Sequence, residues 1–350
     1  MNSRIARIAS LPGFLLLVNA AAWAGRGDVD PNYGEGGRLA TNSPRALLAL
    51  PEDRLVIGEA AGEGLRVRMV DATGQKVTAF GEGGIVLMDS SAAARTFLPE
   101  AAALAPNGDM VFVGALSDTL ARALLRLDKD GQPVLTFGNR GDGFVEPALT
   151  AARATSFAVD PDGSIVLGEG SWTPDSSCGS TARLQRLLAN GQPDTGFGGD
   201  GLSEIPNLEL CEGALVFGAR ADGGVIIGNG HTIVAVDAAG DIDPTFGVDG
   251  RLAVSELGEL AWVWGGLLLP DGGLLIFGSS HPVAVSHDAQ TNDTVFLKFD
   301  RNGQPDLDFG PGTGSVTVDL GAEVLGEPFS REFVNQLALD PDSEHVVAQL

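Results

Sequence analysis

The stretch "DRNGQPDLDFG", residues 300–310, is one of several near copies of a turn motif along this chain. Its Asn-Gly pair favours a positive φ, and its Asp and Asn side chains can close tight turns by hydrogen bonding to the nearby backbone. An aromatic-Gly pair ends the motif, and such pairs recur at Tyr33, Phe80, Phe137, Phe197, Phe246 and Phe309. These aromatic residues are 47, 57, 60, 49 and 63 residues apart, so the chain contains six imperfect copies of one unit.

A second motif lies between the aromatic-Gly pairs. It is a Pro-Asp-Gly-like turn followed by an apolar run that ends in Gly, as in "PNGDMVFVG" from Pro106 and "PDGSIVLG" from Pro161. Each unit contains four short β-rich runs separated by turn residues, and no long stretch has helical periodicity. The sequence therefore predicts an all-β protein, a β-propeller of six blades with mostly four antiparallel strands each. A β-solenoid is the alternative repeat fold, although its coils usually repeat at shorter periods.

The lengths of the connections divide the predicted propeller into two faces. Nine residues separate the end of the third strand from the aromatic residue in five copies, and seven or eight separate the Pro-Asp-Gly-like turn from the Gly that ends the second strand. The other two connections vary, from 9 to 22 residues after the second strand and from 18 to 32 after the aromatic residue. Because strands alternate in direction, both variable connections emerge on one face, where we expect function to reside.

The two ends of the chain are predicted to complete one blade. Residues 333–339 and 345–349 resemble a first and a second strand, and the sequence ends at Leu350. The segment "GRLA", residues 37–40, resembles a fourth strand that has no preceding strands. We therefore expect this N-terminal strand to close the sixth blade, which would hold three strands.

The turn motifs resemble a known repeat. "LDKDGQPVLTFGNRGDG", "LLANGQPDTGFGGDG", "VDAAGDIDPTFGVDG" and "FDRNGQPDLDFGPGTG" are similar to the delta-60 repeat. The resemblance implies a β-propeller of exported, mostly bacterial proteins whose biochemical role is unassigned. This chain departs from the pattern where Tyr33 replaces Phe, Lys76 and Val134 replace Pro or Asp, Leu188 replaces Asp, and Ser343 replaces Gly.

The N-terminus is typical of a secretory signal peptide. Arg4 and Arg7 precede an apolar run of about a dozen residues, and Ala22 and Ala24 form an A-x-A cleavage site. A transmembrane anchor is the alternative, but it needs roughly 20 apolar residues. We expect residues 1–24 to be removed, leaving a single propeller domain, 25–350, that is periplasmic or extracellular, monomeric and not inserted in a membrane.

The charge of the chain excludes some partners. The sequence has 22 Lys and Arg residues against 46 Asp and Glu residues, and loss of Arg4 and Arg7 takes the net charge from −24 to −26. Such a surface repels nucleic acid and anionic lipid, so we expect no nucleic-acid partner. Cations, neutral ligands and other proteins remain as candidates.

Two sets of residues are candidates for metal binding. Asp300, Asn302, Asp306 and Asp308 alternate oxygen ligands as calcium loops do, but turn formation also explains them, and no Glu stands twelve residues into the loop. His231, His281 and His287 fall in variable connections, the last two near Asp288 and Asp293, where a transition metal would need fixed geometry. We expect no cofactor, with calcium as the alternative.

The same variable face carries the candidate ligand-binding residues. These are Trp172, Trp262, Trp264, His231, His281 and His287. A Trp side chain at such a face can stack on a sugar or anchor a protein partner, although a Trp near a strand end is more often packed. The predicted function is an exported binding module for a protein or a glycan.

Catalysis has little support in the sequence. No G-x-S-x-G or H-E-x-x-H motif is present. The alternative function is an extracellular carbohydrate-active hydrolase or lyase that uses acidic residues in the propeller pocket, and its catalytic residues are not identified.

Cys178 and Cys211 both fall in variable connections, and in an exported chain they are candidates for a disulfide, with two free buried thiols as the alternative.

Overall fold

A computed structural model of the chain describes most of the repeat units. The described residues are 5–11, 14–17, 33–35, 38–41, 44–61, 64–88, 97–116, 121–149, 156–169, 179–210, 215–253, 260, 262–279, 294–318, 336–339 and 346–349. All regular structure in these ranges is β-strand or turn, so the predicted all-β class is confirmed. No helix in these ranges is long and apolar enough to cross a membrane.

The strands form five four-stranded antiparallel sheets and one five-stranded sheet. Sheet I is β4 (Pro44–Leu50), β5 (Arg54–Ala61), β6 (Gly64–Val70) and β7 (Ile85–Met88), and sheet II is β8 (Phe97–Leu104), β9 (Met110–Leu116), β10 (Arg122–Leu127) and β11 (Phe144–Val145). Sheet III is β12 (Phe157–Val159), β13 (Ile165–Glu169), β14 (Gly179–Leu187) and β15 (Leu202–Leu210). Sheet IV is β16 (Leu215–Ala219), β17 (Val225–Gly228), β18 (Thr232–Val236) and β19 (Arg251–Ala253), and sheet V is β20 (Trp262–Leu268), β21 (Leu274–Ser279), β22 (Thr294–Phe299) and β23 (Ser315–Val318). Each of the five sheets comes from one predicted unit, with the predicted strand order.

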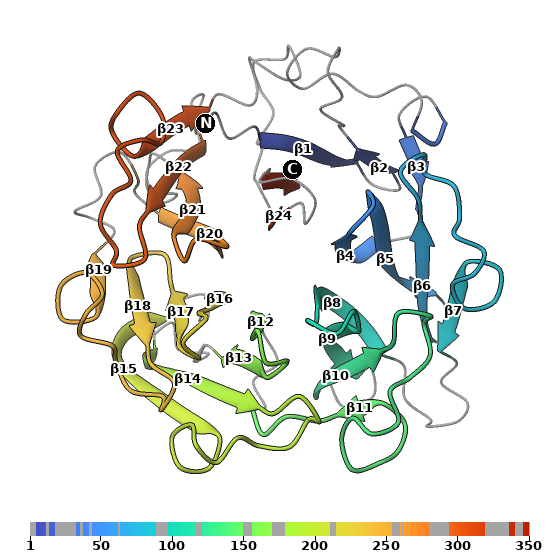
Figure 1. Cartoon of the computed structure of the whole chain (residues 1–350), viewed down its shortest axis with the longest axis horizontal. Coiled ribbons are helices and arrows are strands. Elements are labelled where there is room, and N and C mark those ends of the chain that lie inside the picture. The colour runs from blue at the N-terminus through green and yellow to red at the C-terminus, as the bar shows by residue number, and fades with distance from the viewer. Residues whose placement is uncertain are drawn as a thin grey trace.

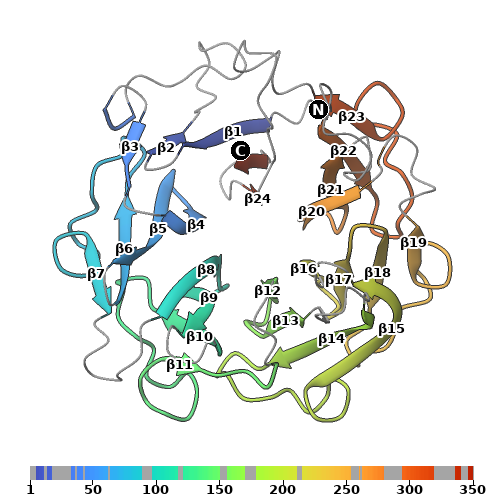
Figure 2. The same ribbon diagram turned by 180° about the vertical axis from the view of Figure 1, so that it is seen from behind.

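The sheets stand around a common axis in the manner of a β-propeller (Figures 1 and 2). The first strand of each unit lies nearest the axis, and the innermost strands contact their neighbours in the order β4, β8, β12, β16, β20. The innermost strand of the last sheet, β24 (Gln336–Leu339), contacts both β20 and β4.

Sheet VI combines the two ends of the chain and differs from the expected three-stranded blade. Its order is β24, β25 (Val346–Gln349), β1 (Ile5–Leu11), β2 (Phe14–Leu17), β3 (Arg38–Ala40). The predicted N-terminal strand therefore shares a sheet with the C-terminal strands. In the full-length chain β1 and β2 lie between them, so this sheet has five strands, whereas three were expected for residues 25–350. The apolar run within residues 1–24 supplies both strands, and β1 pairs with β25 in parallel rather than antiparallel.

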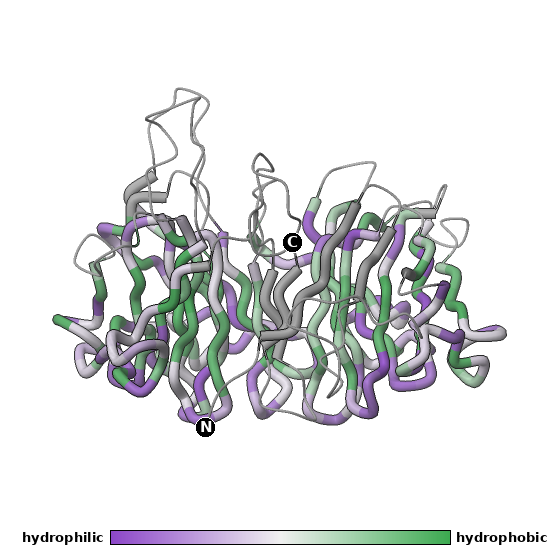
Figure 3. The backbone as a smooth tube through the Cα atoms, turned by 90° about the horizontal axis from the view of Figure 1, so that it is seen from above, coloured by the Kyte–Doolittle hydropathy of each residue, from purple (hydrophilic) through white to green (hydrophobic). Residues whose placement is uncertain are grey.

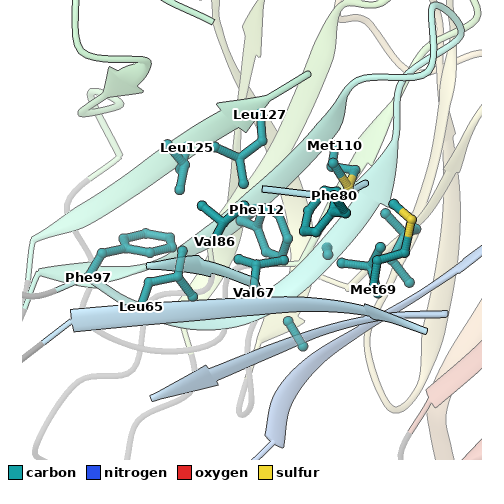
Figure 4. Packing of buried hydrophobic residues seen from close by; sticks show 14 of the residues in the cluster. Leu65, Val67, Met69, Phe80, Val86, Phe97, Met110, Phe112, Leu125 and Leu127 are labelled. Atoms are coloured by element: carbon teal, nitrogen blue, oxygen red, sulfur yellow. The ribbon is translucent and has the colours of Figure 1, made fainter. Parts of the chain in front are cut away.

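The apolar core lies between neighbouring sheets. Every residue of β9 is buried, because both faces of this strand are covered by adjoining sheets. Figure 4 shows the packing between sheets I and II, where Val67 of β6, Phe80, Val86 of β7 and Phe112 of β9 belong to one cluster. Similar clusters lie between sheets II and III, III and IV, IV and V, and VI and I.

Each of these five clusters includes the aromatic residue of a turn motif. Tyr33, Phe80, Phe137, Phe197 and Phe246 are at most 2% exposed, whereas Phe309 of sheet V is only partly buried. The aromatic residue thus belongs to the joint with the following sheet.

The glycine after each aromatic residue makes a backbone hydrogen bond to the next sheet. The N–H groups of Gly34, Gly81, Gly138, Gly198 and Gly247 donate to the carbonyl oxygens of Thr73, Asp130, Asn190, Ala239 and Asn302 at 2.8–2.9 Å. The acceptor always stands one residue before the glycine of the next unit's turn. We call this hydrogen bond, together with the buried aromatic ring beside it, the clasp. For Gly310, no such acceptor lies within the described ranges.

The glycine that directly follows the acceptor residue, which we call the second glycine of the clasp, leaves no room for a side chain. At Gly131, where φ is +86°, a Cβ would lie 2.4 Å from Val86 Cγ2 and 2.9 Å from the Phe80 ring. The turn of sheet II can therefore approach the aromatic ring of sheet I only because this residue has no Cβ.

The connections of constant length form one rim of the ring. The turns after the first and third strands emerge on the same side of the ring, because neighbouring strands run antiparallel, and we call this side the constant rim. Figure 3 shows the ring from the side, with its two rims above and below. The connections of variable length emerge at the opposite, variable rim, because the strands are antiparallel. Most residues of the longer variable connections are outside the described ranges.

Gly131→Ala should destabilise the protein more than Gly108→Ala. Both glycines have nearly the same φ, +86° and +87°, so both substitutions incur about 1–2 kcal/mol for left-handed backbone. A Cβ at Gly108 meets no atom within 4 Å, whereas the overlap at Gly131 adds about 1–3 kcal/mol. Urea unfolding of the two variants measures the difference, and equal losses would contradict the packing role of the clasp.

Tyr33→Phe should leave stability unchanged or raise it. Tyr33 is 1% exposed, its hydroxyl has no hydrogen-bond partner in the described part of the chain, and burial raises its pKa to about 12. Burying an unpartnered hydroxyl costs about 1–3 kcal/mol, and the other copies place Phe here. Thermal unfolding checks this, and a clear loss of stability in the Phe variant would show that the hydroxyl has a partner.

Candidate functional site

Aspartates on the constant rim hold the turns themselves. Asp128 Oδ1 accepts hydrogen bonds from the N–H groups of Asp130 at 2.9 Å and Gln132 at 2.8 Å. Asp71, Asp237 and Asp300 accept two backbone hydrogen bonds in the same pattern. These carboxylates are therefore Asx-turn acceptors.

The calcium candidates belong to this turn network. Asp300 Oδ1 accepts from Asn302 N and Gln304 N, and Asp306 Oδ1 accepts from Asp308 N at 3.1 Å. Lys298 Nζ lies 2.8 Å from Asp306 Oδ2, and its hydrogen bond lowers the pKa of Asp306. Among the described residues, no group of three or more His, Cys, Asp and Glu side chains could hold a metal ion.

Basic side chains also join the sheets at the constant rim. Arg186 of β14 donates to Gly223 O in sheet IV at 2.7 Å and lies 2.6 Å from Asp160 Oδ2. Arg126 of β10 similarly bonds to Asp109 and to Ala189 O in sheet III. The constant rim is thus occupied by contacts that hold the ring together.

Asp160 is the one strongly perturbed carboxyl group in this network. It is 1% exposed, and burial raises its pKa to about 7 despite the neighbouring Arg186 guanidinium. Asp162 and Asp194 lie near the same guanidinium, at 3.8 and 3.4 Å, and act in the same direction as burial.

At the variable rim, His231 and Trp262 come together between sheets IV and V. His231 lies in the short connection from β17 to β18, and Trp262 begins β20. Their ring centroids are 4.3 Å apart and the rings are inclined at 77°, an edge-to-face contact. His231 is exposed and Trp262 is partly buried, so the pair is accessible to a ligand.

Local backbone structure fixes this pair. Asn229 Oδ1 accepts hydrogen bonds from His231 N at 2.8 Å and Thr232 N at 2.6 Å, which closes the turn. Gly230 O accepts from Val263 N at 3.1 Å, and a Cβ on Gly230 would lie 2.2 Å from Trp262 Cε2. The indole therefore rests on a backbone position that only glycine can occupy.

The structure describes only some of the sequence-predicted site residues. It brings His231 and Trp262 together and places Trp264 two residues further along β20, partly buried, next to a register shift. Trp172, His281, His287, Cys178 and Cys211 lie outside the described ranges.

Sequence reasoning missed a set of carboxylate–arginine pairs near the variable rim. Glu59, 1% exposed, lies 2.8 Å from Arg68 and 3.8 Å from Arg66, and Glu169 lies 3.2 Å from Arg183. Glu100 pairs with Arg122. The available signal was a polar residue after the glycine that ends an otherwise apolar second strand, at Glu59, Glu169, Asn229 and Ser279.

Comparisons with known proteins give no function. No protein-family model matches the sequence, and no curated protein sequence matches it. Among solved structures, virginiamycin B lyase from Staphylococcus aureus is 11% identical with a TM-score of 0.42, and the match covers 74% of this chain and 70% of the lyase. For a gluconolactonase from Xanthomonas campestris the values are 14%, 0.39, 67% and 68%, and for the PQQ-bound aldose sugar dehydrogenase from Streptomyces coelicolor they are 12%, 0.44, 80% and 82%. With every TM-score below 0.5, these likenesses carry no argument about the chain.

Asp160 should make stability fall as the pH rises. Its folded-state pKa of about 7 lies above the ordinary 3.8, so its contribution is fully present below pH 3.8 and is lost as the pH rises through about 7. Asp160→Asn removes the titration and should flatten the dependence of unfolding free energy on pH between these values. Urea unfolding at several pH values measures the slope.

Asp308→Asn serves as the control for this experiment, because Asp308 is exposed on the same rim. The slope, rather than the absolute stability, is the readout, since Asp160→Asn also removes a partner of Arg186. A slope unchanged in Asp160→Asn would contradict the assignment.

Proposed function

We propose that the chain is an exported binding module whose ligand, a protein or a glycan, docks at the variable rim. In this proposal residues 25–350 form a monomeric six-bladed propeller of delta-60-like repeats, closed by β3. The contacts of β24 with β20 and β4 support the closed ring.

The contact between exposed His231 and partly buried Trp262 at the variable rim is the observation that carries this proposal. An indole held at a rim by a glycine turn offers a flat, rigid surface at low entropic cost, which is why Trp is enriched at binding sites. Trp264, two residues further along β20, is also partly buried. The constant rim is the less suitable surface, because its carboxylates and basic side chains are engaged in turns and in joints between sheets.

Closure at the joint of sheets VI and I also supports the role of β3. Arg68 of β6 donates to Ala40 O of β3 at 3.1 Å, and Gly34 N donates to Thr73 O. This joint has the clasp of the other joints, so β3 is fastened to sheet I like the outer strand of a regular blade. In the proposed mature protein, β1 and β2 are removed with residues 1–24.

The alternative, a carbohydrate-active hydrolase or lyase, is less well supported. Such chemistry needs a pair of carboxyl groups with access to substrate. The buried carboxylates near the variable rim, Glu59 and Glu169, are bonded to arginines, an arrangement that favours a structural role. We therefore place the binding module first.

Trp262→Ala should abolish ligand-induced stabilisation. The full chain is first expressed in a bacterial host. Export should yield a protein that begins at Gly25, whereas a cytoplasmic protein that still begins with Met1 would contradict export.

Thermal unfolding of the purified protein is then measured with a panel of oligosaccharides and of envelope proteins from the host. A ligand at a hundred times its Kd adds about 2.7 kcal/mol to the wild type.

Two variants control this experiment. Trp262→Phe retains an aromatic surface and should keep part of the effect, and Leu307→Ala changes an exposed residue of the constant rim, 61% exposed, and should keep all of it. A ligand whose effect survives Trp262→Ala but not Leu307→Ala would place binding on the constant rim.

A further inference from the structure

The N-terminal hairpin of β1 and β2 lies between two other strands of sheet VI. β1 pairs in parallel with β25, and β2 pairs antiparallel with β3. Figure 1 shows the hairpin between β24, which lies near the axis, and β3, which lies at the outside of the ring. Removal of residues 1–24 on export would therefore leave the edges of β25 and β3 facing each other across a gap two strands wide. We call this gap the sheet VI slot.

Neighbouring sheets hold the two sides of the slot apart. On the outer side, Gly34 N donates to Thr73 O at 2.9 Å. Arg68 donates to Ala40 O at 3.1 Å, and Leu39 of β3 is buried in the cluster between sheets VI and I. On the inner side, β24 contacts both β20 and β4. Because neighbouring strands lie about 4.8 Å apart, β3 would have to move by two spacings, about 10 Å, to pair with β25.

The N-terminal residues that remain after export are poorly suited to fill the slot. Residues 25–32 read GRGDVDPN, and Gly, Asp, Asn and Pro are all depleted in strands. An unpaired strand edge is a template for pairing with another chain, and two such edges face the slot. We propose that the sheet VI slot binds an extended, apolar and basic segment of a partner protein, which adds strands between β25 and β3.

The hairpin in the slot indicates the chemistry of the partner segment. β1 reads IARIASL and β2 reads FLLL, so nine of these eleven residues are apolar and one is an arginine. Residues 25–350 have a net charge of −26, because the full chain has −24 and Arg4 and Arg7 carry two positive charges. A basic segment is attracted to such a protein and an acidic one is repelled. The partner segment is therefore a β-hairpin that is mostly apolar and carries positive charge.

This inference rests on the export part of the proposed function, because the slot opens only when residues 1–24 are removed. It does not depend on the contact of His231 with Trp262. A protease site inserted after Arg26 separates the two claims. A purified protein that still begins with Met1 would contradict export, and cleavage at the inserted site would then open the slot for the same measurements.

A synthetic peptide of residues 5–17 is the probe. Titrated into protein that begins at Gly25, it should bind with a saturable rise in Tm. The matched control is the same peptide with Ile8→Pro, because Ile8 pairs with both Leu17 and Gln349 and proline cannot donate to a ladder. The control should bind about tenfold more weakly or less. Equal binding of the two peptides, or binding of neither, would overturn the proposal.

Amide hydrogen exchange locates the bound peptide. Exchange should slow in β25 and β3, whose edges face the slot. The outer strands β7 and β23 serve as controls within the chain, since each is also the edge strand of its sheet, and their exchange should not change. Slower exchange in β7 or β23 without slower exchange in β25 and β3 would show unspecific edge pairing and would overturn the proposal.

Cleavage of the folded full chain at the inserted site provides a readout that needs no separate folding of residues 25–350. The N-terminal fragment should stay with the rest of the chain on gel filtration, and excess peptide of residues 5–17 should displace it. A fragment that separates at once from a folded protein would contradict the slot. A dimer of the cleaved protein that the peptide cannot dissociate would show that a second copy, rather than a partner, fills it.

Discussion

The ring depends on one backbone hydrogen bond repeated between sheets, from the glycine after each aromatic residue to a turn of the next unit. Burial of the aromatic ring beside it removes a large apolar surface from water, and the second glycine permits the close approach. Donor and acceptor lie on different units, so each clasp orders two turns at once. The constant length of these turns follows from that requirement, because one additional residue would displace the acceptor.

A second, ionic layer supports the clasps with less regularity. Arg126, Arg186 and Lys298 occupy the same position of the third strand in sheets II, III and V, but in sheet IV that position is Ala235, and Arg220 pairs with Asp243 instead, at 2.6 Å. The paired aspartates of the constant rim therefore contact basic side chains that come from different positions of the repeat unit. Near the variable rim, the described carboxylates Glu59, Glu100 and Glu169 are also paired with arginines. The described residues of that rim that we propose for recognition are therefore His231 and Trp262.

The repeated turns made the strands of sheets I to V predictable, because glycine, proline and aspartate have strong local preferences. The acceptor of each clasp was not predictable, since it lies about one unit away in sequence. The strands β1 and β2 of sheet VI were not predicted, because the apolar N-terminal run was interpreted as a signal peptide, whereas in the full-length chain it pairs as two strands. At the candidate site, the sequence identified His231 and Trp262 as separate ligand-binding candidates on the variable face. Their contact was not predictable, because it depends on how sheet IV packs against sheet V.

Amide hydrogen exchange at the clasp glycines tests the central claim most directly. Gly34, Gly81, Gly138, Gly198 and Gly247 lie in turns at the rim, where amide protons ordinarily exchange fast. If the clasps hold the ring, these five protons should exchange only with global unfolding, while Gly83 and Gly199, whose surroundings are open, exchange quickly. Fast exchange at all seven positions would contradict the account.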